Sequence, residues 1–419
     1  MRSRMVGLAA SAVLVAAPAC AQKSYTPPPA ELVEQARRVL AETPVIDGHN
    51  DLVYMMLEKG GTPEDTDLRA AMPGYHTDLP RLRAGRVGAQ FWSAYVPVDS
   101  LMETGAATRH GLRTVDMVHR LDRKYDDLEL ARTAADIERI EAAGRIASLI
   151  GLEGGHALGN SLSTLRAFYD LGVRYLTLTH SANTDWADAS TDTAEFGGLN
   201  PLGEEIVREM NRLGMFVDIS HVSAETMLDA LRITEAPVIF SHSSARALLD
   251  HPRNVPDEVL KLMPANGGVV MVNFCPCFIA PDYPAWREAE AAEIRRLRNA
   301  GTPRAEFRTA MDSWVRENPP PRGTLQDVAD HIDHIRDVAG IGHIGIGSDF
   351  DGIDFTPVGL DDVSAFPALF AELLRRGYSE AELRKIAGEN LIRAMKQMES
   401  VAARLRTERA PSDGVPSGR

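Results

Sequence analysis

Residues 215–242, MFVDISHVSAETMLDALRITEAPVIFSH, hold the pattern that decides the fold. Two short apolar runs, MFVDISH and APVIFSH, flank the amphipathic stretch SAETMLDALRI. Short apolar, β-branched runs are typical of buried strands, and apolar residues three and four positions apart are typical of a helix. Strands that alternate with helices indicate parallel βαβ units. Both runs end in a histidine, His221 and His242.

The same alternation extends over most of the chain. Eight such runs favour a closed (β/α)8 TIM-like barrel over an open sheet. The runs are PVIDGHND (44–51), RVGAQFWSAYVP (86–97), IASLIGLEGG (146–155), VRYLTLTH (173–180), MFVDISH (215–221), APVIFSH (236–242), GGVVMVNF (267–274) and HIGIGSDF (343–350). Six of them carry side chains that bind metals or move protons, namely His49 with Asp51, Glu153, His180, His221, His242 and Asp349. Barrel enzymes build their sites at the carboxyl ends of the strands, so the pattern predicts a metallohydrolase.

The metal-binding candidates are His49, Asp51, Glu153, His221 and His242. Divalent metals such as Zn²⁺ bind imidazole nitrogen and carboxylate oxygen, and a carboxylate is suited to bridge two ions. Alternation along an extended strand places His49 and Asp51 on one side, where the pair can clamp one ion. His221 and His242 can clamp a second. Each residue taken singly is more often structural, and the joint occurrence on four strands is what favours a metal site.

Composition and charge exclude some classes of function. The chain has 419 residues, 44% of them hydrophobic, and a formal net charge of −14. Because no basic stripe is present, nucleic-acid binding is disfavoured.

The chain divides into several predicted segments. We predict a linker and N-terminal helix over residues 22–43, one barrel domain over 44–403, and a disordered tail over 404–419. The barrel domain has insertions near 62–136 and 278–325. Because the second insertion follows the seventh strand, we expect it over the active-site face as a lid or edge, with a dimer contact as the alternative.

Residues 1–21 are interpreted as an export signal. Arg2 and Arg4 precede an apolar stretch, residues 5–17, that is too short to span a membrane. The small residues around Cys20 fit a signal-peptidase site after residue 19 or after residue 21. Alternatively, Cys20 is the lipidated first residue of a bacterial lipoprotein. We therefore expect an exported protein, either periplasmic or anchored as a lipoprotein in a bacterial cell envelope.

Cys275 and Cys277 follow the seventh run in the segment NFCPCF. The pair can form a loop disulfide, stay reduced or contact a metal. Without a His or Cys cluster beside it, a zinc-ribbon interpretation is weak. Two small buried side chains are the simplest interpretation.

Several other polar residues are interpreted as structural. His331 and His334 have helical i, i+3 spacing, but their helix leads into the amino end of the last strand, away from the chemistry. His156 is expected to orient Glu153 or its loop, and Asp47 to hold His49 by a hydrogen bond.

The constellation resembles the membrane (renal-type) dipeptidase family of peptidases. The resemblance covers residues 44–395, with the family's segments in the expected order. The matching segments are VIDGHNDL, GLEGGHAL, YLTLTHSANTDWAD, VDISHVS, SHSSARAL, RNVPDEVL, DHIDHIRDVAGIGHIGIGSDFDG and GENLIRAM.

The resemblance implies a binuclear zinc site. One ion would be held by His49, Asp51 and Glu153. The other would be held by Glu153, His221 and His242, so that Glu153 bridges. Two ions about 3.5–4 Å apart can produce hydroxide from a bridging water at neutral pH.

Three further roles follow from the resemblance together with position. His180 would contact the scissile carbonyl oxygen and stabilise the oxyanion; the alternative is a structural His in its loop. Asp349 would take a proton from the water and pass it to the leaving amine; the alternative is a carboxylate that only orders the turn after it. Arg253 would bind the substrate's terminal carboxylate; the alternative is an exposed Arg ahead of a helix.

The leading hypothesis is a zinc-dependent dipeptidase that attacks the peptide bond of dipeptides with a metal-bridging hydroxide. The resemblance implies that dipeptides with a C-terminal D-residue are included, and that the protein is a homodimer. The alternatives are an amidohydrolase of N-acyl amino acids and a non-catalytic peptide-binding protein. The last would have lost a site residue, whereas all of them are present.

Overall fold

The computed structural model describes residues 25–98 and 105–413. The predicted export signal, including Cys20, and the last six residues of the predicted tail lie outside these ranges.

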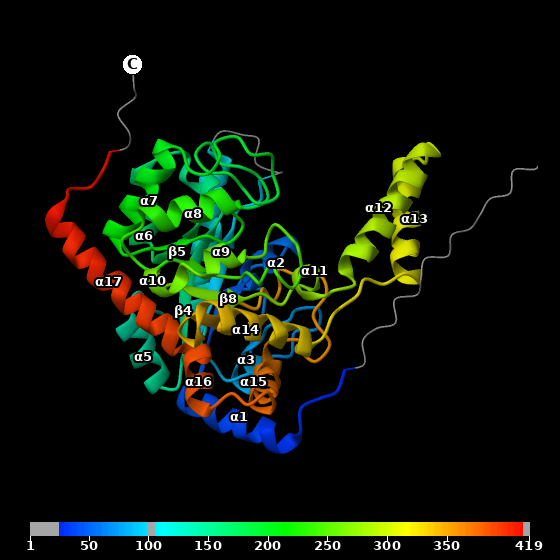
Figure 1. Ribbon diagram of the computed structural model, residues 1–419, viewed down its shortest axis with the longest axis horizontal. Helices are drawn as coiled ribbons and strands as arrows, with labels where there is room; N and C mark the ends of the chain where they lie inside the picture. Colours follow the sequence, from blue (N-terminus) through cyan, green and yellow to red (C-terminus); the bar gives the residue numbers. More distant parts are fainter. Residues whose placement is uncertain (1–24, 99–104, 414–419) are drawn as a thin grey trace, which may run out of the picture. The chain divides into compact units, whose positions relative to one another are not determined.

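A closed barrel of eight parallel strands forms the centre of the fold, with helices around it, as the sequence predicted (Figure 1). Around the barrel the strands follow the order β2, β1, β9, β8, β7, β6, β5, β4, and the pairing of β4 with β2 closes it. The barrel strands are β1 (Val45–Asn50), β2 (Val87–Tyr95), β4 (Ile146–Glu153), β5 (Val173–Thr177), β6 (Phe216–Asp218), β7 (Ile239–Phe240), β8 (Val269–Val272) and β9 (Ile344–Ile346).

A short additional strand, β3 (Leu128–Leu130), was not predicted. It pairs in parallel with residues 146–148 at the start of β4, on the edge where β5 pairs from Ile150 onward. Three residues are too few to show an alternation of apolar and polar side chains, so no sequence pattern indicates this strand.

The helices begin and end at the residues that the local sequence favours. In α7 (Pro201–Leu213) the Asn200 side chain accepts the amide N–H groups of Leu202 and Gly203, and Gly214 ends the helix in the left-handed conformation. The other helices of this part are α1 (Ala30–Glu42), α2 (Leu52–Glu58), α3 (Leu79–Ala84), α4 (Ala106–Lys124), α5 (Ala134–Ala142), α6 (Leu162–Asp170), α8 (Ala224–Ile233), α9 (Asp257–Leu260), α10 (Met263–Asn266), α11 (Pro276–Ile279), α14 (Leu325–Ala339), α15 (Phe366–Arg375), α16 (Glu380–Arg384) and α17 (Asn390–Glu408). In the described ranges no helix is long and apolar enough to cross a membrane.

Large apolar side chains fill the inside of the barrel below the site. Phe91 and Tyr175 pack with their ring centroids 5.0 Å apart, and Phe216 and Met271 belong to the same buried cluster. The barrel is therefore a packed core and not a channel, and its site lies above that core.

Residues 282–321 form a compact unit of their own within the second predicted insertion. It consists of α12 (Tyr283–Asn299) and α13 (Arg304–Glu317). Trp286 and Trp314 pack between the two helices with ring centroids 5.9 Å apart, and the Trp286 indole donates to the Asn318 carbonyl at 2.8 Å. Whether this unit serves as a lid stays a prediction.

The predicted disordered tail does not begin at residue 404, so its first residue was predicted wrongly. Helix α17 continues to Glu408 because Leu405 still packs in the core. Beyond the helix, the carbonyl of Ser412 accepts from the Arg166 guanidinium at 2.7 Å.

The loop between β5 and α7 is folded around one carboxylate, Asp188. The side chain is buried and accepts the backbone N–H groups of four consecutive residues, 195–198, at 2.7–3.1 Å. Burial acts to raise the pKa of Asp188, but these donors outweigh it and hold the pKa below its usual value. The ionised carboxylate therefore stabilises the loop that begins at His180.

Replacing Asp188 by Asn should lower the free energy of unfolding at pH 7 by about 2–3 kcal/mol, the order expected for hydrogen bonds to a charged group. Because the pKa of Asp188 is lowered by folding, this stabilisation is present above the unfolded pKa and is lost as the pH falls through the folded one. Urea unfolding at several pH values measures the difference, with Glu195→Gln as the control, since that side chain is exposed. A difference that does not shrink toward pH 3 would contradict this role.

Candidate metal centre

The side chains predicted from the strand ends meet at the carboxyl end of the barrel. His49 lies within β1, Asp51 follows it directly, and Glu153 is the last residue of β4. The others lie two or three residues beyond their strands, in the loops, and not on the strands as predicted: His180 after β5, His221 after β6, His242 after β7 and Asp349 after β9. All of these side chains nevertheless lie close together at one cleft.

The two carboxylate oxygens of Glu153 face different histidines. Oε2 lies 3.5 Å from Nε2 of His49, whose Nε2 is also 3.1 Å from Oδ2 of Asp51. Oε1 lies 3.1 Å from Nε2 of His221 and 3.5 Å from Nε2 of His242. The Nε2 atoms of His221 and His242 are 2.8 Å apart. A carboxylate placed in this way can serve two ions at once.

The hydrogen bonds behind His242 leave its Nε2 free to bind a metal. The Ser241 hydroxyl donates to Asp218 at 2.6 Å, so its proton is already committed. The His242 Nδ1, 2.8 Å from the same hydroxyl, must then carry the hydrogen and donate it. The lone pair is thereby on Nε2, which is the arrangement that metal-binding histidines adopt.

A tyrosine from the barrel core fixes His49. The Tyr175 hydroxyl lies 2.9 Å from Nδ1 of His49, and both side chains are buried. The ring reaches this position only because residue 151 is glycine: a Cβ there would come within 1.9 Å of the Tyr175 ring. Gly151 in β4 therefore contributes to the placement of His49 in β1.

Burial also sets the protonation states. It lowers the pKa of His221 and His242 well below the usual value, so both imidazoles are neutral at pH 7. Burial acts to raise the pKa of Glu153, but His49 and His221 hold it well below the usual range. Burial acts to lower the pKa of His49, but the groups around it raise this pKa well above its usual value. The neutral imidazoles of His221 and His242 and the ionised carboxylate of Glu153 are in the forms that divalent zinc prefers. The residues present therefore fit a metal centre.

Three groups of ligand atoms lie within 4.8 Å of one another, and they do not sort the residues into the two expected sets. The groups are His49 with Glu153 and His242, Glu153 with His180 and His221, and His49 with Asp51 and Asp349. All five predicted ligands are brought together, but the division between the two ions stays an expectation from the resemblance.

Asp349 adjoins this cluster with a strained backbone. Its φ is +64°, and His221 has a φ of +67°, values that residues other than glycine seldom adopt. Its Oδ2 accepts from the side-chain amide of Asn273 at 2.9 Å. Burial raises the pKa of Asp349 to about 7. Gly352 leaves room for it, since a Cβ there would lie 2.6 Å from Asp349 Oδ1 and 2.2 Å from Asp51 Oδ2.

His180 lies between two rings at the side of the cluster. It stacks on His221 with the centroids 4.2 Å apart, and the Tyr95 ring is 4.5 Å away on another side. Its Nε2 is 3.9 Å from Oε1 of Glu153, and its buried Nδ1 has no protein partner among the described residues. Burial lowers the pKa of His180, so it can donate one ring N–H as a neutral imidazole.

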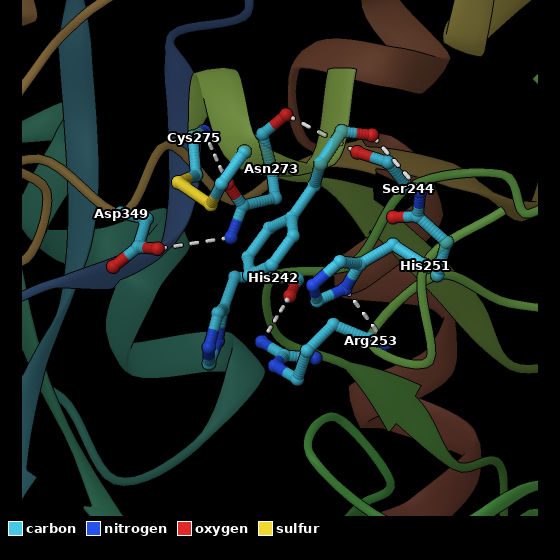
Figure 2. The surroundings of a disulfide bond; sticks show 10 residues. His242, Ser244, His251, Arg253, Asn273, Cys275 and Asp349 are labelled. Carbon is cyan, nitrogen blue, oxygen red and sulfur yellow. Dashed lines mark hydrogen bonds between the residues drawn. A yellow bond between two sulfur atoms is a disulfide. The ribbon is translucent and has the colours of Figure 1, made fainter. Parts of the chain in front are cut away.

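Arg253 is buried, with 3% of its surface exposed, so the alternative of an exposed Arg was wrong. Nη1 donates to Ser243 at 3.3 Å and Nη2 to the carbonyl of His242 at 3.2 Å (Figure 2). Its Nε is buried without a protein acceptor in the described chain. Burial lowers the pKa of Arg253 to about 10, which still leaves the guanidinium charged at pH 7. Such a cation suits an anionic ligand.

The residues interpreted as structural make hydrogen bonds that do not involve the side chains of the metal ligands. His331 Nδ1 accepts the amide of Ala245 at 3.0 Å, and His334 pairs with Asp257 at 2.7 Å. His156 contacts the carbonyl of Asn183 and so holds a loop. Asp47 accepts from Ser348 at 2.6 Å and reaches His49 only through its backbone amide.

The cluster forms the floor of a cleft of about 540 Å³. The cleft is also lined by residues that sequence reasoning did not assign to the site, namely Tyr54, Tyr95, Cys275, Cys277, Phe278 and Ile353. Cys275 and Cys277 form a disulfide, the first of the three alternatives, and both are partly exposed, so the interpretation as two small buried side chains was wrong. Strand-end spacing gives no signal for these residues, because they come from loops and helices whose path the spacing does not define.

The comparisons with known proteins agree with the geometry. A family model described as membrane dipeptidase (peptidase family M19) matches residues 33–409. The chain belongs to the membrane dipeptidase family. It is therefore a metallo-dipeptidase, and the alternatives of an N-acyl amino acid amidohydrolase and of a non-catalytic binding protein are not favoured.

Among its relatives, this dipeptidase is 42% identical over 393 residues to dipeptidase verJ of Clonostachys rogersoniana, a match that covers 89% of each chain. The crystal structure of the probable dipeptidase PvdM from Pseudomonas aeruginosa is similar with a TM-score of 0.79 and 25% identity, over 89% of this chain and 100% of that one. A metallopeptidase from Rhodobacter sphaeroides, bound to a phosphinate mimic of L-Ala-D-Ala, has a TM-score of 0.71 and 26% identity, over 85% of this chain and 99% of that one.

Proposed function

We propose that this dipeptidase uses two zinc ions to hydrolyse free dipeptides, including those with a C-terminal D-residue. The observation that carries the proposal is the position of Glu153, whose two oxygens face different histidines in the cleft that also contains Asp349 and Arg253.

Five residues would hold the ions. His49, Asp51 and Glu153 would bind one, and Glu153, His221 and His242 the other, as the family resemblance implies. The bound zinc would supply Lewis acidity, lowering the pKa of a water ligand to about 7.

Arg253 and His180 would hold the substrate. The buried guanidinium of Arg253 is the group in the cleft with the charge and the spare N–H to bind the dipeptide's carboxylate. A carboxylate held there fixes how far the peptide bond lies from the chain's end, which selects short substrates. His180, as a neutral imidazole, would donate its N–H to the scissile carbonyl oxygen and stabilise the negative charge that develops on it.

Asp349 would carry the proton. As the water oxygen forms its bond to the carbonyl carbon, Asp349 accepts one water proton. It then gives this proton to the amide nitrogen while the C–N bond breaks, so the products are a free amine and a carboxylic acid, which releases the second water proton as it ionises. A carboxyl whose pKa lies near the working pH performs both transfers well, and burial has brought Asp349 into that range.

Acceptance of D-residues at the second position rests on analogy. The Rhodobacter sphaeroides metallopeptidase binds a mimic of L-Ala-D-Ala, and its fold and size match this chain. Dipeptides released from the cell wall would supply such substrates to an exported enzyme.

Metal analysis and a dipeptide panel test the proposed function. We expect about two zinc ions per chain, the number that a two-metal mechanism needs, and cleavage of both L-Ala-L-Ala and L-Ala-D-Ala. One ion per chain at full activity would contradict the two-metal mechanism. Cleavage restricted to L-Ala-L-Ala would contradict the acceptance of D-residues.

Replacing Arg253 by Met should raise KM for free dipeptides by about 10–200-fold, since a hydrogen-bonded charge pair contributes roughly 1.5–3 kcal/mol. Steady-state kinetics with a dipeptide and its C-terminal amide measure this effect. The amide lacks the carboxylate, so the wild type should handle it poorly and the variant should change little further. An equal loss on both substrates would mean that Arg253 supports the fold of the cleft and does not bind the carboxylate.

We also infer an exported homodimer, from the basic and apolar start of the sequence and from the family resemblance. Cell fractionation, mass analysis of the mature N-terminus and light scattering test export, lipidation of Cys20 and dimerisation separately. A mature chain that begins at residue 20 and carries acyl groups would select the lipoprotein alternative.

A further inference from the structure

Asp349 is held by a side chain that no sequence motif assigned to the site. Asn273 follows β8 directly and is fully buried, and Asp349 lies in the loop after the neighbouring strand β9. Its Nδ2 donates to Oδ2 of Asp349 at 2.9 Å, as Figure 2 shows.

The orientation of the Asn273 amide is fixed from its other end. Oδ1 of Asn273 accepts the backbone N–H of Cys275. Since a carbonyl oxygen accepts and an amide nitrogen donates, this contact turns the NH₂ group toward Asp349. The backbone carbonyl of Asn273 accepts a further hydrogen bond from the Ser244 hydroxyl at 3.2 Å. The side-chain amide is thus hydrogen-bonded at both Oδ1 and Nδ2.

The Cys275–Cys277 disulfide closes the loop that supplies this contact. The two cysteines flank Pro276, and both line the cleft. The crosslink and the proline ring together restrict the backbone on which the Cys275 N–H is carried. Figure 2 shows this N–H bonded to Asn273 beside the disulfide.

The hydrogen bond from Asn273 gives the two carboxylate oxygens of Asp349 different surroundings. Oδ2 is engaged by Asn273, while Oδ1 lies on the side of Gly352 and Asp51, at the cleft. One oxygen is thereby anchored, and the other faces the place where the substrate and water would react. A proton carrier needs this arrangement, because the same oxygen must reach the water first and the leaving nitrogen afterward.

We propose that Asn273 is a positioning residue that orients Asp349 for proton transfer, and that the loop closed by the Cys275–Cys277 disulfide holds Asn273 in place. This inference rests on the proposed role of Asp349. Asn273 does not touch the substrate in this scheme. Its contribution is to kcat and not to substrate binding.

The competing explanation is that Asn273 only ties down the 273–277 loop. Replacing Asn273 by Asp separates the two, because the shape is kept. The Asp variant retains an oxygen for the Cys275 N–H, so a loop-holding role would survive. It replaces the donor that faces Asp349 by an acceptor, so the positioning role would be lost.

The experiment compares four purified metal-loaded proteins by kcat, KM, zinc content and Tm on L-Ala-L-Ala. They are wild type, Asn273→Asp, Asp349→Asn and Asn390→Asp. Asn390 is the matched control: it is a buried Asn that donates to carbonyls of Ile341 and Ile344, at the opposite end of β9 from Asp349. Its variant should lower Tm and leave kcat and KM of the folded enzyme unchanged.

We expect Asn273→Asp to lower kcat by about 10–100-fold, the usual cost of removing a partner that orients an active group. KM and zinc content should stay within about twofold of the wild type. A kcat near that of the wild type would overturn the inference, as would a loss that appears only in KM or zinc content. If Asp349→Asn itself stays active, the proposed role of Asp349 as proton carrier fails, and the inference fails with it. If Asp349→Asn is inactive and Asn273→Asp is active, only the inference fails.

The double variant Cys275→Ala, Cys277→Ala supplies a second test, which remains informative if Asn273→Asp does not fold. It keeps the Asn273 donor and releases its loop. We expect a lower kcat than in the wild type, but a smaller loss than with Asn273→Asp, and unchanged KM and zinc content. An unchanged kcat would overturn the part assigned to the disulfide loop.

Discussion

Replacing Glu153 by Gln should remove the metal and the activity together. The uncharged amide offers one oxygen and one nitrogen donor where the carboxylate offers an oxygen to each group of histidines. Both ion positions would be weakened, and with them several kcal/mol of transition-state stabilisation, which is a loss of about 10³-fold or more in kcat/KM. Zinc content by mass spectrometry and dipeptide hydrolysis measure the two effects.

Glu141→Gln is the matched control for that variant. The side chain of Glu141 lies near the base of the barrel, where it lines a separate cleft together with Pro44 and Ile46. Burial raises the pKa of Glu141 to about 7. Removing its charge should leave zinc content and kcat/KM unchanged. If Glu153→Gln kept two ions per chain, the bridging role of the carboxylate would be disproved.

Replacing Asp349 by Asn should lower kcat by about 10²–10⁴-fold, the range that general acid–base catalysis contributes. Zinc content should be retained, since the five proposed ligands remain. The comparison is Asp351→Asn, a nearby buried residue that also has a positive φ, but whose Oδ1 accepts the amide of His76 at 2.7 Å. This control should lose less than tenfold. Equal losses in the two variants would indicate damage to the turn and not loss of a proton carrier.

Much of the fold could be predicted because each barrel strand is formed by one short segment of the sequence. Each apolar run is continuous in sequence, and the closure of eight parallel strands follows from the βα alternation. The predicted strand ends were less accurate. β6 and β7 stop at Asp218 and Phe240, and the histidines follow in loops. After β6 the backbone must leave the extended conformation for His221 to adopt its positive φ.

The supports of the site could not be predicted in the same way. Tyr175 reaches His49 across the barrel, and the contact depends on the register of β4 and on the absence of a side chain at Gly151. Asn273 likewise acts on a residue of another segment. Ser241 orients its neighbour His242 only because Asp218, from another strand, accepts the Ser241 proton. A single sequence carries no information on such pairings, since each partner looks like an ordinary core or loop residue. The disulfide remained one of three alternatives because Cys-Pro-Cys spacing alone does not decide the redox state.

The left-handed backbone at His221, Asp349 and Asp351 has a consequence for attempts to engineer this enzyme. Each such conformation costs a non-glycine residue roughly 1–2 kcal/mol, and glycine would adopt it without strain. A selection for thermal stability alone would therefore favour glycine at these three positions. At His221 and Asp349, stability and turnover would then be selected in opposite directions, so a screen for more stable variants needs an activity step in every round.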